Sequence, residues 1–472
     1  MSDNESMDII DEENDSEMEE EKSARVDNDS DKEVYLPGKP LAEGEELVCD
    51  QTAYVMLHQA QTGAPCLSFD IINDNLGNNR ETFPLTAYVV AGTQAGQAHI
   101  NNIIVMKLSN LYATNKDDDE DDEDDDESDD ESDKNPKMKL SNLYATNKDD
   151  DEDDEDDDES DDESDKNPKM AGALIKHQGC VNRIRSTTIN ATVLAASWSE
   201  LGRVNVWNLT QQLQTVDSEL LLQRYNKENK GNSVTPLFTF SGHQQEGFAL
   251  DWCDTLPGTL ATGDCKRDIH IWHIDEGGNS WKVDQRPLVG HSHSVEDLQW
   301  SPNERNVLAS CSVDKSIRIW DTRAPPNKSC MITADAAHES DVNVISWNKN
   351  EPFIASGGDD GFLKVWDLRR FVDKTPVAIF KHHTAPVTSV EWHGTDSAVF
   401  ASSGEDNQIA LWDLSVEKDD NDVKEVEGIP PQLLFIHQGQ IDIKELHWHP
   451  QLPGVIISTA ASGFNIFRTI SV

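Results

Sequence analysis

Four types of side chain recur in this sequence at a spacing that could support chemistry, and they are His, Ser or Thr, Asp and Trp. Three consecutive units carry all four types: His291, Ser310, Asp314 and Trp320; His338, Ser356, Asp360 and Trp366; and His383, Ser402, Asp406 and Trp412. In each unit, the Ser lies ten residues and the Asp six residues before the Trp. His, Ser and Asp are the residue types of a hydrolase triad, in which the His removes a proton from the Ser hydroxyl.

The repetition favours a structural role over a catalytic one, because an enzyme needs one active site and this set occurs in successive units. Buried His, Ser, Asp and Trp side chains can hydrogen-bond in series, so that each satisfies a neighbour that would be costly to bury alone. An earlier unit has His243, Thr262 and Trp272, but Lys266 stands at its Asp position, with Asp264 nearby. The sequence shows no P-loop and no zinc-type cysteine spacing. We therefore predict a protein that is not an enzyme and needs no cofactor.

Two series of tryptophans set the period of the repeat. The first comprises Trp207, Trp272, Trp320, Trp366 and Trp412, and its last three steps are 48, 46 and 46 residues. The second comprises Trp252, Trp300, Trp347, Trp392 and Trp448. A period of roughly 40–50 residues with Gly-His and Trp-Asp pairs resembles the WD repeat, in which each propeller blade has four strands.

Counting units gives seven blades. Five end at the first tryptophan series, a sixth spans His437–Phe467 with Phe467 at the Trp position, and a seventh comes from strands between Cys66 and Leu111. An N-terminal strand should pair with the C-terminal blade, because this closes the ring and removes the free sheet edges. We therefore predict an all-β fold, a seven-bladed WD40 β-propeller with an N-terminal α-helix and disordered acidic segments.

The charge of the chain is concentrated outside the repeated region. Among 472 residues there are 90 acidic and 39 basic side chains, and the formal net charge is -51. Residues 117–133 and 149–165 together carry -30, and residues 1–34 are also strongly acidic. Such a chain favours basic partners, and its overall field opposes binding to DNA or to an anionic membrane.

Cysteine usage and hydropathy exclude further classes of protein. The seven cysteines are scattered, which indicates reduced thiols in an intracellular protein rather than a disulfide framework. The N-terminus lacks the basic and apolar regions of a secretory signal, and no apolar run reaches the length of about 18 residues that a transmembrane helix needs.

These patterns divide the chain into five predicted segments. They are a disordered acidic tail at 1–34, an N-terminal helix region at 35–65, strands of a first blade at 66–111, a disordered acidic insert at 112–169, and the remaining blades at 170–472. The helix is expected over Asp50–Gln61, where Ala53, Leu57 and Ala60 would share one face.

A perfect tandem repeat interrupts the first blade. Met106–Lys137 recurs without any change as Met138–Lys169, which indicates either a recent duplication or an error in the gene model. The first copy continues directly from the strand Asn102–Val105 and should supply a strand of the propeller. The second copy has no obvious free position, and we expect it to lie in an acidic loop.

Two segments resemble the histone-chaperone branch of the WD-repeat family, in which an N-terminal helix lies beside a seven-bladed propeller. They are Glu45–Ile72 and the acidic segment with paired prolines, Glu417–Phe435. Longer strings, including DQRPLVGH at 284–291, resemble the glutamate-rich WD-repeat proteins of ribosome biogenesis. The resemblance implies a non-enzymatic nuclear and nucleolar assembly factor of the large ribosomal subunit, which escorts a basic ribosomal protein and binds histones.

The same resemblance implies where partners would bind. In that branch, the helix and the Pro-Pro loop flank a groove for a basic helix of histone H4. Carried to this sequence, the contacts are Tyr54, Leu57, His58, Asp419, Asp420, Asp422, Glu425, Glu427, Pro430 and Pro431. The plainer alternatives are a helix that shields a propeller edge, a simple surface loop, and acidic runs that only keep the chain soluble. Ser128 and Ser160 lie in acidic contexts that resemble kinase sites.

A second function stays open at this point. Trp320-Asp321-Thr322-Arg323 and Trp366-Asp367-Leu368-Arg369 resemble the WDxR box of substrate receptors for cullin-type ubiquitin ligases. In that case, Arg323 and Arg369 would contact the ligase adaptor.

Overall fold

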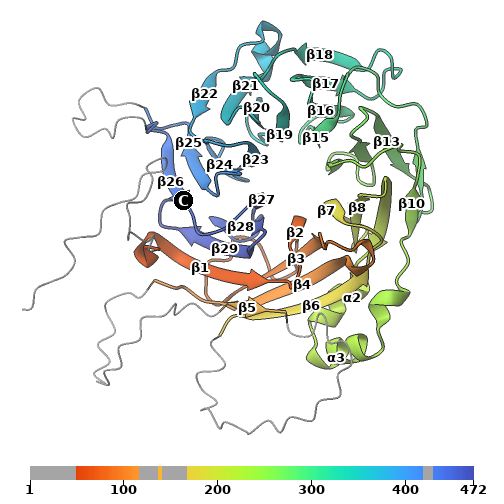
Figure 1. Cartoon of the computed structure of the whole chain (residues 1–472), viewed down its shortest axis with the longest axis vertical. Helices are drawn as coiled ribbons and strands as arrows, with labels where there is room; N and C mark the ends of the chain where they lie inside the picture. The colour runs from red at the N-terminus through yellow and green to blue at the C-terminus, as the bar shows by residue number, and fades with distance from the viewer. Residues whose placement is uncertain (1–48, 116–136, 141–166, 418–428) are drawn as a thin grey trace, which may run out of the picture. The chain divides into compact units, whose positions relative to one another are not determined.

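The computed structural model describes residues 49–115, 137–140, 167–417 and 429–472 (Figure 1). Residues 49–472 belong to one compact unit, and its described part forms seven sheets arranged in a ring. The predicted seven-bladed propeller is therefore confirmed. The predicted acidic tail at 1–34 and the two acidic runs lie outside the described residues.

The blades are numbered here along the ring, from the first complete blade of the chain, and each begins with its innermost strand. Blades 1 and 2 contain β2 (Cys66–Ile72), β3 (Leu85–Thr93), β4 (Asn102–Leu111) and β6 (Lys169–Lys176), then β7 (Val181–Ile189), β8 (Thr192–Ser199), β9 (Arg203–Asn208) and β10 (Phe238–Phe240). Blades 3 and 4 contain β11 (Ala249–Trp252), β12 (Leu260–Gly263), β13 (Ile269–Ile274) and β14 (Trp281–Val283), then β15 (Val295–Trp300), β16 (Val307–Ser312), β17 (Ile317–Asp321) and β18 (Cys330–Ala334). Blades 5 and 6 contain β19 (Val342–Trp347), β20 (Phe353–Gly358), β21 (Phe362–Asp367) and β22 (Ala378–Lys381), then β23 (Val387–Trp392), β24 (Val399–Gly404), β25 (Ile409–Asp413) and β26 (Leu433–His437). Blade 7 contains β27 (Ile443–Trp448), β28 (Val455–Ala460), β29 (Gly463–Thr469), β1 (Tyr54–Gln61) and β5 (Met138–Lys139).

Helices are few, and two of them cover the outer side of blade 1 (Figure 1). The helices are α2 (Thr210–Val216) and α3 (Glu219–Lys227), and the 3-10 turns are η2 (Gln51–Ala53), η3 (Ala98–Ile100), η4 (Lys230–Ser233) and η5 (Leu368–Asp373). Both helices lie in the connection between β9 and β10. On α3, the Tyr225 hydroxyl donates to the Leu174 carbonyl of β6 at 2.8 Å, which fixes this connection against blade 1.

The blades are held together by apolar cores that neighbouring blades share. The middle strands have both faces covered, and they therefore read as nearly continuous runs of buried residues, as in β28 and β24. The first tryptophan series lies on the third strand of each blade. Four members of this series, Trp272, Trp320, Trp366 and Trp412, are at most 2% exposed. Phe467 takes the same place in blade 7, where its ring stacks on His437 with centroids 4.1 Å apart.

The predicted helix over Asp50–Gln61 is wrong. Gln51–Ala53 form a single 3-10 turn, capped by the Asp50 carboxylate, and the following eight residues form β1. This strand pairs antiparallel with β29, so an N-terminal strand does close the ring. Tertiary pairing overrides the helical spacing because β29 offers a free edge of backbone hydrogen-bonding groups. Both faces of β1 are then covered, with Met56 in one core and Leu57 in another. Of the predicted region 35–65, residues 35–48 lie outside the described part.

The boundary predicted after the first blade also needs correction. Lys169–Lys176 form β6, the outer strand of blade 1, so the insert lies between the third and fourth strands of one blade rather than before the next blade. The expectation that the second repeat copy has no position in the fold is wrong for its first residues. Met138–Lys139 form β5, which pairs in parallel with β1. Met138 is 4% exposed. The edge of β1 supplies the free position that sequence alone did not reveal.

Candidate functional site

The recurring His, Ser, Asp and Trp residues form hydrogen-bonded sets within single blades. In blade 4, His291 Nδ1 lies 2.9 Å from Asp314 Oδ2, and its Nε2 lies 2.6 Å from Ser310 Oγ. The Trp320 indole N–H donates to the same Ser Oγ at 2.8 Å. The same arrangement joins His338, Ser356, Asp360 and Trp366 in blade 5, and His383, Ser402, Asp406 and Trp412 in blade 6.

Blade 3 completes the same set with a different residue from the one at the expected position. His243 Nδ1 lies 2.9 Å from Asp264 Oδ2, and its Nε2 lies 2.8 Å from Thr262 Oγ1. Asp264 also accepts the backbone N–H groups of Lys266 and Asp268. The expectation that this unit lacks its Asp is therefore wrong. The carboxylate is supplied from two residues earlier in the same turn.

The burial of these sets supports bracing rather than catalysis. Ser310, Ser356 and Ser402 are each 0% exposed, so no substrate could reach their hydroxyls without opening the blade. The Asp carboxylates are held as anions. For Asp360, burial raises the pKa but the hydrogen bond and charge of His338 lower it further, to about 2. Each set thus ties the loops at one face of its blade to the second and third strands.

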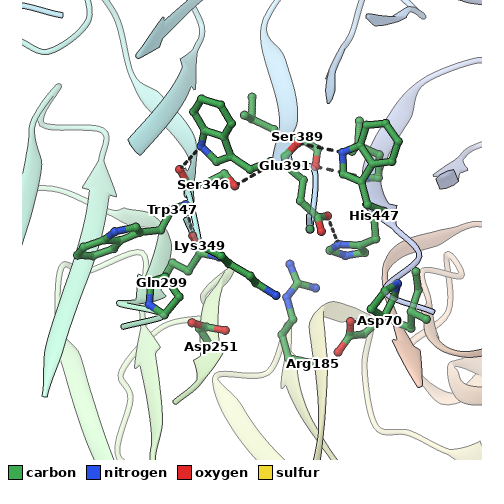
Figure 2. Close-up of a pocket in the computed structure, with 18 of the residues that line it drawn as sticks. Asp70, Arg185, Asp251, Gln299, Ser346, Trp347, Lys349, Ser389, Glu391 and His447 are labelled. Atoms are coloured by element: carbon green, nitrogen blue, oxygen red, sulfur yellow. Dashed lines mark hydrogen bonds and ion pairs between the residues drawn. The ribbon is translucent and has the colours of Figure 1, made fainter. Parts of the chain in front are cut away.

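A cavity of about 320 Å³ opens at one mouth of the central channel (Figure 2). Its walls are the ends of the innermost strands and the loops that follow them. Figure 2 shows the side chains of Arg185, Asp251 and Lys349 directed toward its centre. The strands of each blade alternate in direction, so this face also carries the connections between third and fourth strands.

The second tryptophan series lines this cavity and ties adjacent blades together. Indole N–H groups donate to backbone carbonyls of the preceding blade in four cases: Trp252 to Arg185 at 3.0 Å, Trp300 to Asp251 at 3.1 Å, Trp392 to Ser346 at 3.0 Å and Trp448 to Glu391 at 3.1 Å. The first series therefore braces single blades, and the second joins neighbours around the ring.

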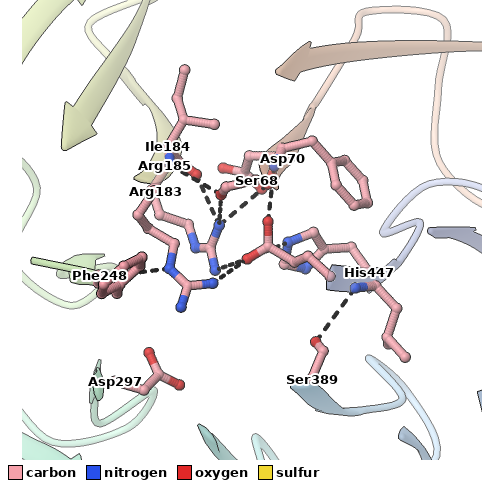
Figure 3. Close-up of polar contacts among 12 residues, drawn as sticks. Ser68, Asp70, Arg183, Ile184, Arg185, Phe248, Asp297, Ser389 and His447 are labelled. Carbon is pink, nitrogen blue, oxygen red and sulfur yellow. Dashed lines mark hydrogen bonds and ion pairs between the residues drawn. The ribbon is translucent and has the colours of Figure 1, made fainter. Parts of the chain in front are cut away.

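A buried charge network crosses the channel wall (Figure 3). The Glu445 side chain is 2% exposed, and its Oε1 lies 2.5 Å from Arg183 Nη1 and 2.6 Å from Arg185 Nη2. Its Oε2 accepts the backbone N–H of Phe69 at 2.8 Å. Burial raises the pKa of Glu445, but the two guanidinium groups outweigh it and hold the pKa well below its usual range. One carboxylate thus joins the innermost strands of blades 1, 2 and 7.

His447 extends this network to blade 6. Its Nδ1 lies 2.7 Å from Glu391 Oε2 on β23. Burial lowers its pKa, but the charges and hydrogen bonds of Glu391 and Glu445 raise it to about 10, so the imidazole is protonated at neutral pH. Within the described part of the chain, no group of three or more His, Cys, Asp or Glu side chains is arranged to hold a metal ion. No helix there is long and apolar enough to cross a membrane.

The contacts with partners that were predicted on β1 belong to the propeller interior. Tyr54 is 4% exposed, and its hydroxyl lies 2.8 Å from His437 Nδ1. Leu57 is buried in the core shared by blades 6 and 7, and His58 Nε2 lies 2.9 Å from the Tyr112 carbonyl oxygen. The prediction of partner contacts for these three side chains is therefore corrected, because a strand with two covered faces offers no side chain to a partner.

The start of β1 instead joins two acidic parts of the chain to the fold. The Thr114 N–H donates to the Val55 carbonyl at 3.0 Å, just before the segment 116–136. The Tyr54 ring packs edge-on against Phe435, with centroids 5.4 Å apart, just after the segment 418–428. We call Tyr54, Val55, Thr114 and Phe435 the β1 junction. Both neighbouring connections link third and fourth strands, so they lie on the face that carries the cavity.

The remaining predicted partner and modification residues divide by position. Pro430 accepts the Leu433 N–H at 3.0 Å in the turn that leads into β26, and Pro431 is exposed beside it. The residues outside the described part of the chain are Asp419, Asp420, Asp422, Glu425, Glu427, Ser128 and Ser160.

The two WDxR arginines occupy matching positions on blades 4 and 5. Arg323 binds Asp321 through two nitrogens, at 2.9 and 2.7 Å, and Arg369 binds Asp367 in the same way, at 2.9 and 2.8 Å. Their side chains are 69% and 63% exposed. Each guanidinium is therefore held in a fixed direction at the surface.

The channel network is the main feature that sequence reasoning missed. Its members stand two residues apart, as Arg183 with Arg185 and Glu445 with His447. Residues two apart on a strand share one face. This pairing of charges on strands expected to be buried is a signal that could have located the network.

Comparisons with known proteins agree with this architecture. A family model for the histone-binding protein RBBP4, a component of the CAF1 complex, matches residues 44–112, and the WD domain, G-beta repeat model matches 283–321, 329–367 and 374–413. The chain is 43% identical to Protein HEAT STRESS TOLERANT DWD 1 of Arabidopsis thaliana, over 93% of this chain and 92% of that protein. It is 41% identical to Ribosome assembly protein rrb1 of Schizosaccharomyces pombe, covering 93% and 84%. It is 43% identical to Glutamate-rich WD repeat-containing protein 1 of Dictyostelium discoideum, covering 93% and 85%.

Proposed function

Because this chain belongs to the family of glutamate-rich WD-repeat and ribosome assembly proteins, we propose that it escorts a basic protein of the large ribosomal subunit and also binds histones. In this proposal it acts in the nucleus and nucleolus and catalyses no reaction. The propeller serves as a rigid frame that presents acidic segments to the client.

The observation that carries the proposal is the β1 junction. The junction begins at Tyr54 and Val55, inside the segment that matches the histone-binding family model. The same two residues contact the chain that leads into one acidic run and the chain that follows the acidic loop. Residues 117–133 and 149–165 carry -30, a charge that attracts Lys- and Arg-rich proteins and competes with RNA for them.

Neutralising the acidic runs should reduce client capture by about tenfold or more at physiological salt, because this attraction is electrostatic. The variant replaces every Asp and Glu of 117–133 and 149–165 with Asn and Gln. Capture of histone H4 and of large-subunit ribosomal proteins from nuclear extract is then compared at physiological and at high salt. The parent should lose most of its clients at high salt.

A scrambled variant provides the matched control for this experiment. It keeps the composition of both runs and changes only their order, so its charge is unchanged and its capture should match the parent. The proposal is wrong if the neutralised variant captures basic clients as well as the parent does.

The fixed arginines support a second candidate, a substrate receptor of a cullin-type ubiquitin ligase. Arg323 and Arg369 are exposed at equivalent positions and could both meet one adaptor surface. Exchanging both for Ala should abolish capture of a cullin adaptor from nuclear extract. Arg370→Ala, at the exposed neighbouring position, is the control and should leave capture unchanged. Equal adaptor capture by the parent and the double variant, or none by either, would exclude this candidate.

A further inference from the structure

We propose that the groove between β1 and β6 is a docking site for a short extended segment of a basic partner, and that Met138–Leu140 occupies it as an internal ligand. The segment it would take has an apolar, a basic and an apolar residue in succession. The partner's basic character rests on the proposed function, whereas the groove itself rests on the contacts described below.

The internal segment is held as an added strand. Met138 stands opposite Ala60 and Lys139 opposite Gln61, in parallel, and the Leu140 N–H donates to the Gln61 carbonyl at 3.1 Å. The first half of the same edge of β1 is covered by Thr114, whose Oγ1 accepts the Leu57 N–H at 3.0 Å. The end of this edge would be open if β5 were not there. An open strand edge is a template for another extended chain.

The groove has an apolar position for each end of the segment. Met138 is 4% exposed in the core that contains Met56 and Ala60, and Leu140 packs against the same core. Gly172 on β6 makes the space for Leu140, because a Cβ on this glycine would lie 2.6 Å from Leu140 Cδ1. A glycine inside a strand weakens the strand, and it often marks a place where another chain approaches closely.

The middle position suits a basic residue. Lys139 is exposed, so its charge stays in water while its neighbours are buried. The acidic runs 117–133 and 149–165 flank this short strand in the sequence on both sides. A client with the same pattern would therefore find apolar contacts in the groove and carboxylates joined to it.

The shortness of β5 makes the internal ligand displaceable. Only two of its residues pair with β1, so the contact itself is small. Its covalent tether gives it an effective concentration of about millimolar, which a partner must overcome. A partner that also binds the acidic runs can do so, because its own strand is then presented at a similar effective concentration.

The tandem repeat allows the groove to be emptied without a foreign junction. Removing 138–169 joins Lys137 to Met170, and the resulting Asn-Pro-Lys-Met sequence is identical to the natural one before β6. A fluorescent peptide of residues 134–145 then serves as the probe, and fluorescence anisotropy measures its binding. We expect the deletion variant to bind this peptide at least about tenfold more tightly than the full chain, in which the tethered segment competes.

Two further variants decide whether the groove is the binding site. Gly172→Val in the deletion variant fills the Leu140 position with a residue that strands favour, so peptide binding should be lost while the unfolding temperature is kept. A peptide with Leu140→Asp should not bind. If the deletion variant does not fold, a full chain with Met138→Asp and Leu140→Asp replaces it, because this change expels the segment and leaves the groove.

The inference is overturned if the emptied chain does not bind the peptide, or if it binds equally with Gly172 and with Val at this position. These results are independent of the proposed function, since that is judged by salt-sensitive capture of histones and ribosomal proteins. Normal client capture with no peptide binding would refute the docking groove alone. Peptide binding without client capture would refute the escort role alone.

Discussion

Glu445→Gln should lower the free energy of unfolding by about 3–5 kcal/mol, because it removes the negative charge from a buried cluster of cations. Arg183 and Arg185 both point at this carboxylate from blade 2, and His447 adds a third positive charge. Gln cannot neutralise them. Chemical denaturation followed by tryptophan fluorescence measures the change.

Two comparisons make this prediction specific. Glu405→Gln, at an exposed position, is the control and should change stability by no more than about 0.5 kcal/mol. Unchanged stability in Glu445→Gln would mean that the charges are solvated and that the network does not join the blades.

The same network predicts a pH dependence. The pKa of His447 is about 10 in the folded protein, above its unfolded value of about 6.5. Its contribution to stability is therefore complete below about pH 6.5 and is lost as the pH rises toward 10. The difference in unfolding temperature between the parent and His447→Gln should shrink over this range. A difference that is constant from pH 6 to pH 10 would contradict a protonated His447.

Leu57→Ala should lower the free energy of unfolding by about 2–5 kcal/mol, the range for removing a buried Leu side chain. Leu57 is 4% exposed on the strand that closes the ring, in a core with Trp448 and Phe467. A cavity there loosens the contact between the chain ends. Thermal and denaturant unfolding would both show the loss.

The exposed Gln61 at the end of the same strand provides the control. Gln61→Ala should stay within about 0.5 kcal/mol of the parent. Full stability of Leu57→Ala with impaired histone capture would restore Leu57 as a partner contact and would contradict its place in the core.

Much of the fold could be predicted because the blades repeat. The Trp320 and Ser310 pair lies within one blade, and the two side chains are only ten residues apart. The same spacing recurs in the following blades, so the pattern stands out from the background without any knowledge of the fold. The identity of the repeated residue types also separated a structural brace from a single catalytic site.

Errors arose where a local pattern had two solutions. Asp50–Gln61 has helical spacing, but its strand partner on β29 lies at the other end of the chain, where Tyr54 pairs with Thr469. In blade 3, two acidic side chains near the expected position were possible, and only the turn geometry selects Asp264. Met138 shows the same limit, because a sequence copy does not reveal a free strand edge.

Residue types and their order were therefore enough to identify the repeat, the blade count, the bracing side chains and the separation of acidic segments from the propeller. These properties depend on short separations that recur along the chain. The folded ring was needed to establish that β1 is a strand, that β5 has a place, and that Glu445 meets arginines up to 262 positions away. These contacts form when the ring closes, because closure brings distant strand edges and buried charges together whose spacing along the chain carries no period.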